Sequence, residues 1–254
     1  GETIVEAQLE LPALKRFEPK IAGATVDAVD TRGKAMLTRF DNGLTLYSHN
    51  QLYGRWYTVK RPRLPATGRT LRVALHTATH SAILYSASDI EVLTEPELGS
   101  HPFLKRIGPD VLDPVLTADA VVDRLESSAF RNRSLGALYL DQSFIAGLGN
   151  YLRTEILWAA GLHPSLKPSA LTRAQLVCLA KQTIAISKRS YRTRGLTVPP
   201  SLARSLKDAG TGYEARRFQV FGREDLPCRS CGTAVERLTV SSRNLFVCPQ
   251  CQPA

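Results

Sequence analysis

The sequence lacks any long apolar run, and this absence argues against a membrane-spanning helix. Such a helix needs about 20 mainly apolar residues, whereas the longest candidate, Leu135–Leu162, is interrupted by Asp141, Arg153 and Glu155. The first six residues, Gly1-Glu2-Thr3-Ile4-Val5-Glu6, also lack the basic and apolar segments of a secretory signal. We therefore expect a cytoplasmic protein with no membrane partner.

Cysteine is scarce, and four of the five cysteines form two close pairs, Cys228-x2-Cys231 and Cys248-x2-Cys251, separated by sixteen residues. Tetrahedral Zn²⁺ takes four thiolates, and two tight turns can each deliver two of them. The residues between the pairs alternate as a hairpin with a polar tip at Ser241–Asn244, too short to bury a core of its own. The pattern therefore predicts one structural Zn²⁺ in a closed site, because a metal must supply the folding energy.

Two disulfides or an iron–sulfur centre are the alternatives for these four cysteines, and a reducing cytosol disfavours disulfides. The fifth cysteine, Cys178, stands alone in the apolar helical run Leu176–Ala180. We predict that it is a small buried hydrophobic residue.

Acidic residues are fewer than basic ones, 23 Asp+Glu against 33 Lys+Arg, which gives a formal net charge of +10. Such an excess favours a polyanionic partner, because each neutralised phosphate releases counterions. A basic surface with no binding role is the alternative.

The pattern of apolar residues changes along the chain and predicts an α+β fold. The first part is rich in strands punctuated by turn residues, which is typical of an antiparallel β-sandwich. The expected strands are Thr3–Leu11, Ala24–Thr31, Ala35–Phe40, Leu44–His49, Arg55–Lys60, Leu71–His76, Ser81–Ser86 and Glu91–Thr94. The expected helices are Ala118–Ser127 after a Thr117 cap, Ser134–Gln142, Tyr151–Ala160 and Thr172–Tyr191.

Three domains follow from this pattern: a β-sandwich over residues 1–98, a helical domain over residues 99–218 and the zinc β-hairpin over residues 219–254. The stretch Arg192–Arg217 is basic and holds two prolines, and we expect a mobile loop there. The turn Gly147-Leu148-Gly149-Asn150 precedes a helix, with Asn150 as the expected N-cap. It predicts a helix–two-turn–helix with a phosphate site, and an ordinary capped turn is the alternative.

Several long segments resemble the endonuclease VIII branch of the formamidopyrimidine-DNA glycosylase/endonuclease VIII family. They are Thr31–Lys34, Tyr47–Gly54, Leu84–Asp89, His101–Pro114, the Gly-Leu-Gly-Asn turn and Ser241–Arg243. The similarity runs from near Gly1 to the zinc hairpin, and the stretch at about 192–217 departs from it. The resemblance implies a base excision repair enzyme that flips an oxidised pyrimidine out of double-stranded DNA. It also implies AP lyase activity, with β- and δ-elimination at the abasic site.

In this family a secondary amine, an N-terminal proline followed by a glutamate, forms a Schiff base with the sugar C1′. Gly1 aligns with the turn after the family's first helix, so we expect the Pro-Glu terminus and that helix to be missing from this chain. Two alternative functions follow: a DNA-binding module without lyase activity, and a zinc-ribbon regulator whose β-rich half binds a partner.

The resemblance also assigns roles to individual residues. Lys34 is expected to be the general acid of β-elimination and to contact phosphate. Arg243 is expected to clamp a phosphate and to assist δ-elimination. Gln51, Leu52 and Tyr53 would fill the gap left by the extruded base, while Arg106 and Asn150 would contact the DNA backbone. We expect a monomer that associates with the nucleoid by binding DNA with oxidised bases or abasic sites.

Overall fold

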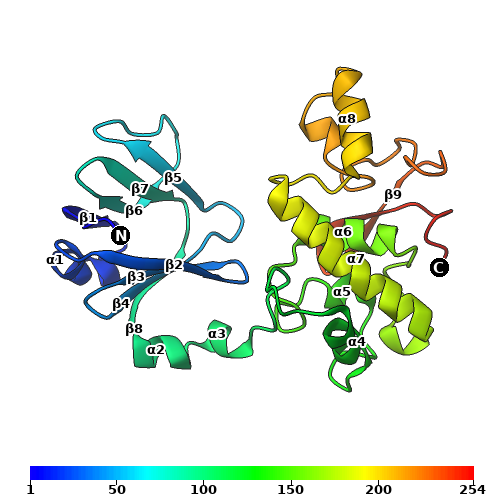
Figure 1. Cartoon of the computed structure of the whole chain (residues 1–254), viewed down its shortest axis with the longest axis horizontal. Coiled ribbons are helices and arrows are strands. Elements are labelled where there is room, and N and C mark those ends of the chain that lie inside the picture. Colours follow the sequence, from blue (N-terminus) through cyan, green and yellow to red (C-terminus); the bar gives the residue numbers. More distant parts are fainter. The chain divides into compact units, whose positions relative to one another are not determined.

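The structure is a computed structural model that describes residues 1–254 as two compact units, Gly1–Arg106 and Ile107–Ala254 (Figure 1). None of the helices combines the length and the apolar character needed to cross a membrane. The domain boundaries expected near residues 98 and 218 remain predictions.

The first unit is an antiparallel β-sandwich, as predicted. One sheet has the strand order β1-β6-β7-β5 and the other has the order β2-β3-β4-β8. The strands are β1 (Glu6–Leu9), β2 (Val26–Arg32), β3 (Ala35–Phe40), β4 (Leu44–His49), β5 (Arg55–Lys60), β6 (Leu71–His76), β7 (His80–Tyr85) and β8 (Asp89–Thr94). Alternate residues of these strands, among them Leu46, Val73 and Leu84, form an almost fully buried apolar core.

Four strands, β3 to β6, begin and end at the predicted residues. The prediction missed two short helices, η1 (Pro12–Phe17) and α1 (Glu18–Ile21), where Leu14 and Ile21 are buried in the sandwich core. Each helix is too short to show a helical period in the sequence. Two more helices, α2 (Glu95–Ser100) and α3 (Pro102–Arg106), end the unit.

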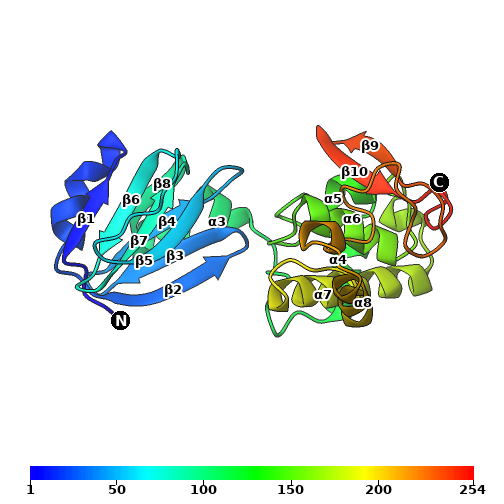
Figure 2. The same ribbon diagram turned by 90° about the horizontal axis from the view of Figure 1, so that it is seen from above.

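The second unit is a helical domain that carries a β-hairpin (Figure 2). Its helices are α4 (Ala118–Glu126), α5 (Leu135–Leu138), α6 (Asn150–Ala159), η2 (Pro168–Ala170), α7 (Arg173–Arg192), α8 (Pro200–Asp208) and η3 (Glu214–Arg216). The hairpin strands are β9 (Glu236–Val240) and β10 (Arg243–Val247). Leu245 and Val247 of β10 are buried in the same apolar cluster as the helices, so the hairpin packs on the helical core.

Local capping explains where two of the helices begin. The hydroxyl of Thr117 accepts a hydrogen bond from the backbone N–H of Ala120, which confirms the predicted cap of α4. Thr172 and Gln175 form a reciprocal capping box at the start of α7. The helix expected over Ser134–Gln142 is shorter than predicted, because the Asp141 carboxylate accepts the backbone N–H of Ser143 and starts a turn.

The prediction of a loop over Arg192–Arg217 is wrong, because this stretch contains α8 and η3. Pro200 occupies the first position of α8, where a backbone N–H would have no partner within the helix, so its absence in proline costs nothing. Residues with high helix propensity follow it.

The burial predicted for Cys178 is also wrong, since its side chain is exposed. Leu176, Leu179 and Thr183 mark the buried face of α7, and Cys178 points away from it.

Candidate nucleic-acid interface and metal centre

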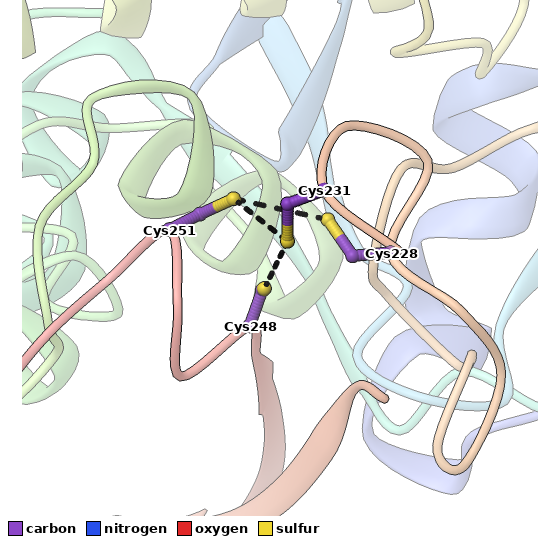
Figure 3. Close-up of side chains that lie close together, drawn as sticks. All are labelled: Cys228, Cys231, Cys248 and Cys251. Carbon is purple, nitrogen blue, oxygen red and sulfur yellow. Dashed lines mark hydrogen bonds between the residues drawn. The ribbon is translucent and has the colours of Figure 1, made fainter. Parts of the chain in front are cut away.

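The four paired cysteines meet in one cluster, which confirms the predicted metal centre (Figure 3). Their sulfur atoms all lie within 4.8 Å of one another. The Sγ atoms of Cys231 and Cys248 are 3.4 Å apart, and those of Cys228 and Cys251 are 3.9 Å apart. Tetrahedral Zn²⁺ with bonds of about 2.3 Å places its sulfur ligands about 3.8 Å apart. The cluster therefore fits one structural Zn²⁺, and its four protein ligands leave no open position for a substrate.

The metal centre fixes the base of the hairpin, and the tip projects from it. Cys248 directly follows β10, and the N–H of Cys228 donates to the carbonyl of Thr233 in the first cysteine turn. Ser241 and Ser242 turn the chain with φ of 53° and 58°, the left-handed conformation that a tight hairpin needs. Arg243 comes next and is exposed at the tip, where it can meet a partner.

The glycine turn lies beside this hairpin, although its cap differs from the prediction. Gly149 is the N-cap of α6, and Asn150 is the first helical residue, without a capping bond from its side chain. The Asn150 amide is used elsewhere: its Nδ2 donates to the backbone carbonyl of Asn244 at 2.8 Å. The turn and the hairpin tip are thus joined through Asn150.

A second bridge between the turn and the hairpin is Arg153, whose side chain is fully buried. Its Nη1 donates to the carbonyls of Gly136 at 2.8 Å and Val240 at 3.3 Å. Its Nη2 donates to Oδ1 of Asn150 at 2.5 Å and to the carbonyl of Asn244 at 3.5 Å. All four acceptors are neutral oxygens, so these contacts leave the charge of Arg153 without a negative partner.

The pKa of Arg153 reflects both its burial and a neighbouring positive charge. Burial lowers this pKa, and the positive charge of Arg243 lowers it further, to about 10. The guanidinium still carries its proton at neutral pH. Two cations therefore lie close together at the hairpin tip, and their field favours an anion there. This positive field is what a phosphate site requires.

Glu155, two residues after Arg153, is also buried and organises a different segment. Its carboxylate accepts the backbone N–H groups of Gln219, Val220 and Phe221 at 2.8–2.9 Å. It also accepts the hydroxyl of Thr197 at 2.6 Å. One carboxylate therefore holds both ends of the segment that carries α8. These roles could not be predicted from the sequence, in which Arg153 and Glu155 appear only as charges within an apolar run.

In the first unit, Lys34 occupies the two-residue turn Gly33-Lys34 between β2 and β3 and is exposed. Gly33 adopts φ of 61°, which allows the tight turn. Burial lowers the pKa of His49, and the charge of Lys34 adds to this effect while Asp89 opposes it. Lys34 therefore lies near the end of β4, the strand that leads into the Gln51–Tyr53 segment.

Gln51, Leu52 and Tyr53 form the tip of the loop between β4 and β5. The side chains of Leu52 and Tyr53 are 72% and 71% exposed, so two large apolar groups lie next to each other at the tip of this loop. Arg106 is exposed at the end of α3, and its Nε donates to the carbonyl of Pro102 at 3.2 Å. The structure thus groups Asn150 with the Arg243 hairpin in one unit, and places Lys34, the exposed loop and Arg106 in the other.

Comparisons with known proteins agree with this architecture. Residues 1–88 match the formamidopyrimidine-DNA glycosylase N-terminal domain, residues 107–199 match its H2TH domain, and residues 225–254 match a zinc finger found in FPG and IleRS. Endonuclease 8 from Escherichia coli (strain K12 / DH10B) is 49% identical over 253 residues, which covers 99% of this chain and 92% of that protein. Endonuclease 8 from Enterobacter sp. (strain 638) is 49% identical over 252 residues, with the same coverage of both chains.

Solved structures show the same fold. Lactococcus lactis Fpg (MutM), solved with DNA that contains an N7-benzyl-Fapy-dG, has a TM-score of 0.82 at 20% identity and covers 100% of this chain and 93% of that one. The Lactococcus lactis Fpg in complex with abasic-site DNA has a TM-score of 0.80, with the same identity and coverage. On the sequence matches, the chain belongs to the formamidopyrimidine-DNA glycosylase/endonuclease VIII family and is an endonuclease VIII-like DNA glycosylase and AP lyase in the base excision repair of oxidised bases.

Proposed function

We propose that this protein excises oxidised pyrimidines from double-stranded DNA and then cuts the abasic site by β- and δ-elimination. The observation that carries the proposal is the pair of positive charges at the hairpin tip, Arg243 and the buried Arg153, beside the amide of Asn150. A DNA phosphate supplies the negative charge that this arrangement lacks. Arg243 and Asn150 would then grip the backbone next to the lesion, with Arg106 as a further phosphate contact.

The exposed loop tip supports the flipping step of this proposal. A base leaves the duplex only if its stacking and pairing are broken, and an apolar side chain that enters the gap stabilises the open state. Leu52 is the apolar wedge, while Gln51 and Tyr53 flank it with one amide and one ring. We call Asn50–Gly54 the wedge loop.

Lys34 supports the elimination step. Its exposed ammonium at the tip of the β2–β3 turn can contact a phosphate and can deliver a proton to the reacting sugar. Arg243 acts differently, because a guanidinium holds its protons tightly and is a poor proton donor. We assign it an electrostatic role, which stabilises the charge that develops on the phosphate leaving group.

The test uses a duplex with one oxidised pyrimidine and the same duplex with the intact base. The protein should release the oxidised base only, and the cut strand should end in phosphates on both sides of the gap. The lyase reaction needs an amine of the protein at the sugar C1′, and borohydride reduces the Schiff base that this amine forms. A covalent adduct trapped on abasic DNA would support the lyase proposal. Tight binding of abasic DNA with no adduct and no strand cut would contradict the lyase proposal and would favour a DNA-binding module.

A further inference from the structure

The wedge loop has a defined shape, and three contacts outside its tip hold that shape. The backbone N–H of Gly54 donates to the carbonyl of Asn50 at 2.7 Å and closes the loop. A side chain at position 54 would not fit, since a Cβ there would lie 2.6 Å from Cα and O of Asn50. Gly54 is therefore a steric requirement of the loop.

The second contact comes from the turn between β7 and β8. The hydroxyl of Ser88 donates to Oε1 of Gln51 at 3.0 Å. Gln51 needs such support, because its backbone has φ of 50°, a left-handed conformation that a residue with a side chain seldom adopts. With Oε1 occupied, the Nε2 group of Gln51 keeps its two N–H donors for another partner.

The third contact comes from the segment between β5 and β6. Nη1 of Arg69 donates to the backbone carbonyl of Tyr53 at 2.5 Å. This bond fixes the outgoing side of the loop, as Ser88 fixes the incoming side. Leu52 lies between Gln51 and Tyr53, the two anchored residues, and makes no comparable contact. The position of its 72% exposed side chain therefore depends on how these two neighbours are held.

We propose that Ser88 and Arg69 are positioning residues that preorganise the wedge loop, so that Leu52 enters the base stack without a prior rearrangement of its backbone. The inference rests on the wedge role proposed above for Leu52. The backbone of a preformed loop does not have to become ordered during base flipping. A smaller part of the favourable free energy of DNA binding is then offset by lost conformational entropy. The two side chains need not touch the lesion.

Ser88→Ala and Arg69→Gln test the proposal on two duplexes, one with a paired oxidised pyrimidine and one with a stable abasic analogue. Each variant should lower the single-turnover excision rate on the paired lesion by roughly threefold to tenfold, the value of one hydrogen bond. Binding of the abasic analogue should change little, because little stacking remains to be broken. Fluorescence of 2-aminopurine placed next to the lesion reports base opening, and its rate of change should fall by the same factor as the excision rate.

Controls separate positioning from charge and from folding. Arg63→Gln removes an equal charge from the same exposed segment, so a similar loss there would show that Arg69 acts only through electrostatics. Ser88→Thr keeps the hydroxyl and should restore most of the rate. Equal losses on both duplexes, or no rescue by threonine, would overturn the proposal.

A double-mutant cycle with Leu52→Ala distinguishes failure of this inference from failure of the wedge role. If Ser88 and Arg69 act through Leu52, their removal should cost little once Leu52 is absent. Additive losses would show that Ser88 and Arg69 act independently of the wedge and would overturn the inference. A Leu52→Ala variant that harms both duplexes equally would instead overturn the proposed wedge role itself.

Discussion

The zinc hairpin and the wedge loop both turn through left-handed residues and expose a side chain at the tip, yet they are held in different ways. The hairpin is held by a four-cysteine cluster, by Leu245 and Val247 in the core, and by the buried Arg153. The wedge loop is held by a few exposed polar bonds and one glycine. Loss of a hairpin support should therefore lower the stability of the protein more than loss of a loop support.

The physical reason for this contrast is where each support lies. A buried charge or a metal ligand has no water to replace its lost partner, so its removal leaves an unsatisfied group. A hydrogen bond at the surface is exchanged for one to water at small cost.

Loss of the metal should have the largest effect. Structural Zn²⁺ contributes roughly 10 kcal/mol or more to the folding of small zinc modules. Cys248→Ser should abolish stoichiometric zinc, measured by atomic absorption, and should weaken DNA binding in the same protein. A metal-free variant with normal affinity for DNA would show that the helical core alone positions Arg243.

Arg153→Met should have the next largest effect. The substitution leaves the carbonyls of Gly136 and Val240 without their donor, which should cost roughly 2–4 kcal/mol of unfolding free energy. Denaturant unfolding measures this loss. Arg153→Lys should rescue it only in part, because an ammonium cannot reproduce the fork of bonds. An unchanged stability would break the contrast between the two turns.

Leu52→Ala should have a moderate effect that is confined to the excision of paired lesions. It should slow excision of a paired oxidised pyrimidine by the equivalent of about 1–3 kcal/mol, a few kcal/mol being the cost of base unstacking. Single-turnover kinetics measures the rate, and thermal unfolding should show no change because Leu52 is 72% exposed. A loss of stability would mean that the loop is part of the core after all.

Arg243→Gln should remove about one phosphate contact and should therefore make DNA binding less sensitive to salt. The plot of log K against log salt for the wild type should have a slope near −5 if about 5–6 phosphates are contacted, and the variant should be shallower by about 0.9. Fluorescence anisotropy at several salt concentrations gives both slopes. An unchanged slope would place Arg243 away from the DNA backbone.

The smallest effect concerns pH. Burial lowers the pKa of His49 from its ordinary value of about 6.5, so the folded first unit favours the neutral imidazole. The unfolded chain then binds more protons below pH about 6.5, and the unfolding free energy should fall as the pH drops through that range. His49→Asn should remove this component of the slope. An NMR titration that finds the pKa of His49 above 6.5 would contradict the expected sign.

Much of this architecture could be predicted from the sequence, because it rests on local patterns. The alternation of apolar residues predicted β3 to β6 residue by residue, and the cysteine spacing predicted the metal centre. The positions that failed depend on tertiary contacts. Asn150 has the right chemistry for a cap, yet its amide donates to Asn244, which lies 94 residues further along the chain. Cys178 shares an apolar run with buried neighbours, and only the packing of α7 shows that it faces solvent.

The roles of Arg153 and Glu155 were hidden for the same reason. A charged residue in an apolar helix predicts an interruption, and nothing local shows that its partners are carbonyls and N–H groups from distant segments. Ser88 and Arg69 were hidden too, because each meets the wedge loop from a different connection between strands.

Because Glu155 holds both ends of the segment that carries α8, the two ends lie together at a common base. The N–H of Thr197 donates to the carbonyl of Arg217 at 2.9 Å and closes it at its base. The closure entropy of a loop grows only slowly with its length, so such a segment can lengthen, shorten or change sequence at small cost. The closed base therefore separates changes in the exposed part of this segment, such as α8, from the supports of the metal centre. The same base offers protein engineers a place to graft a new recognition element.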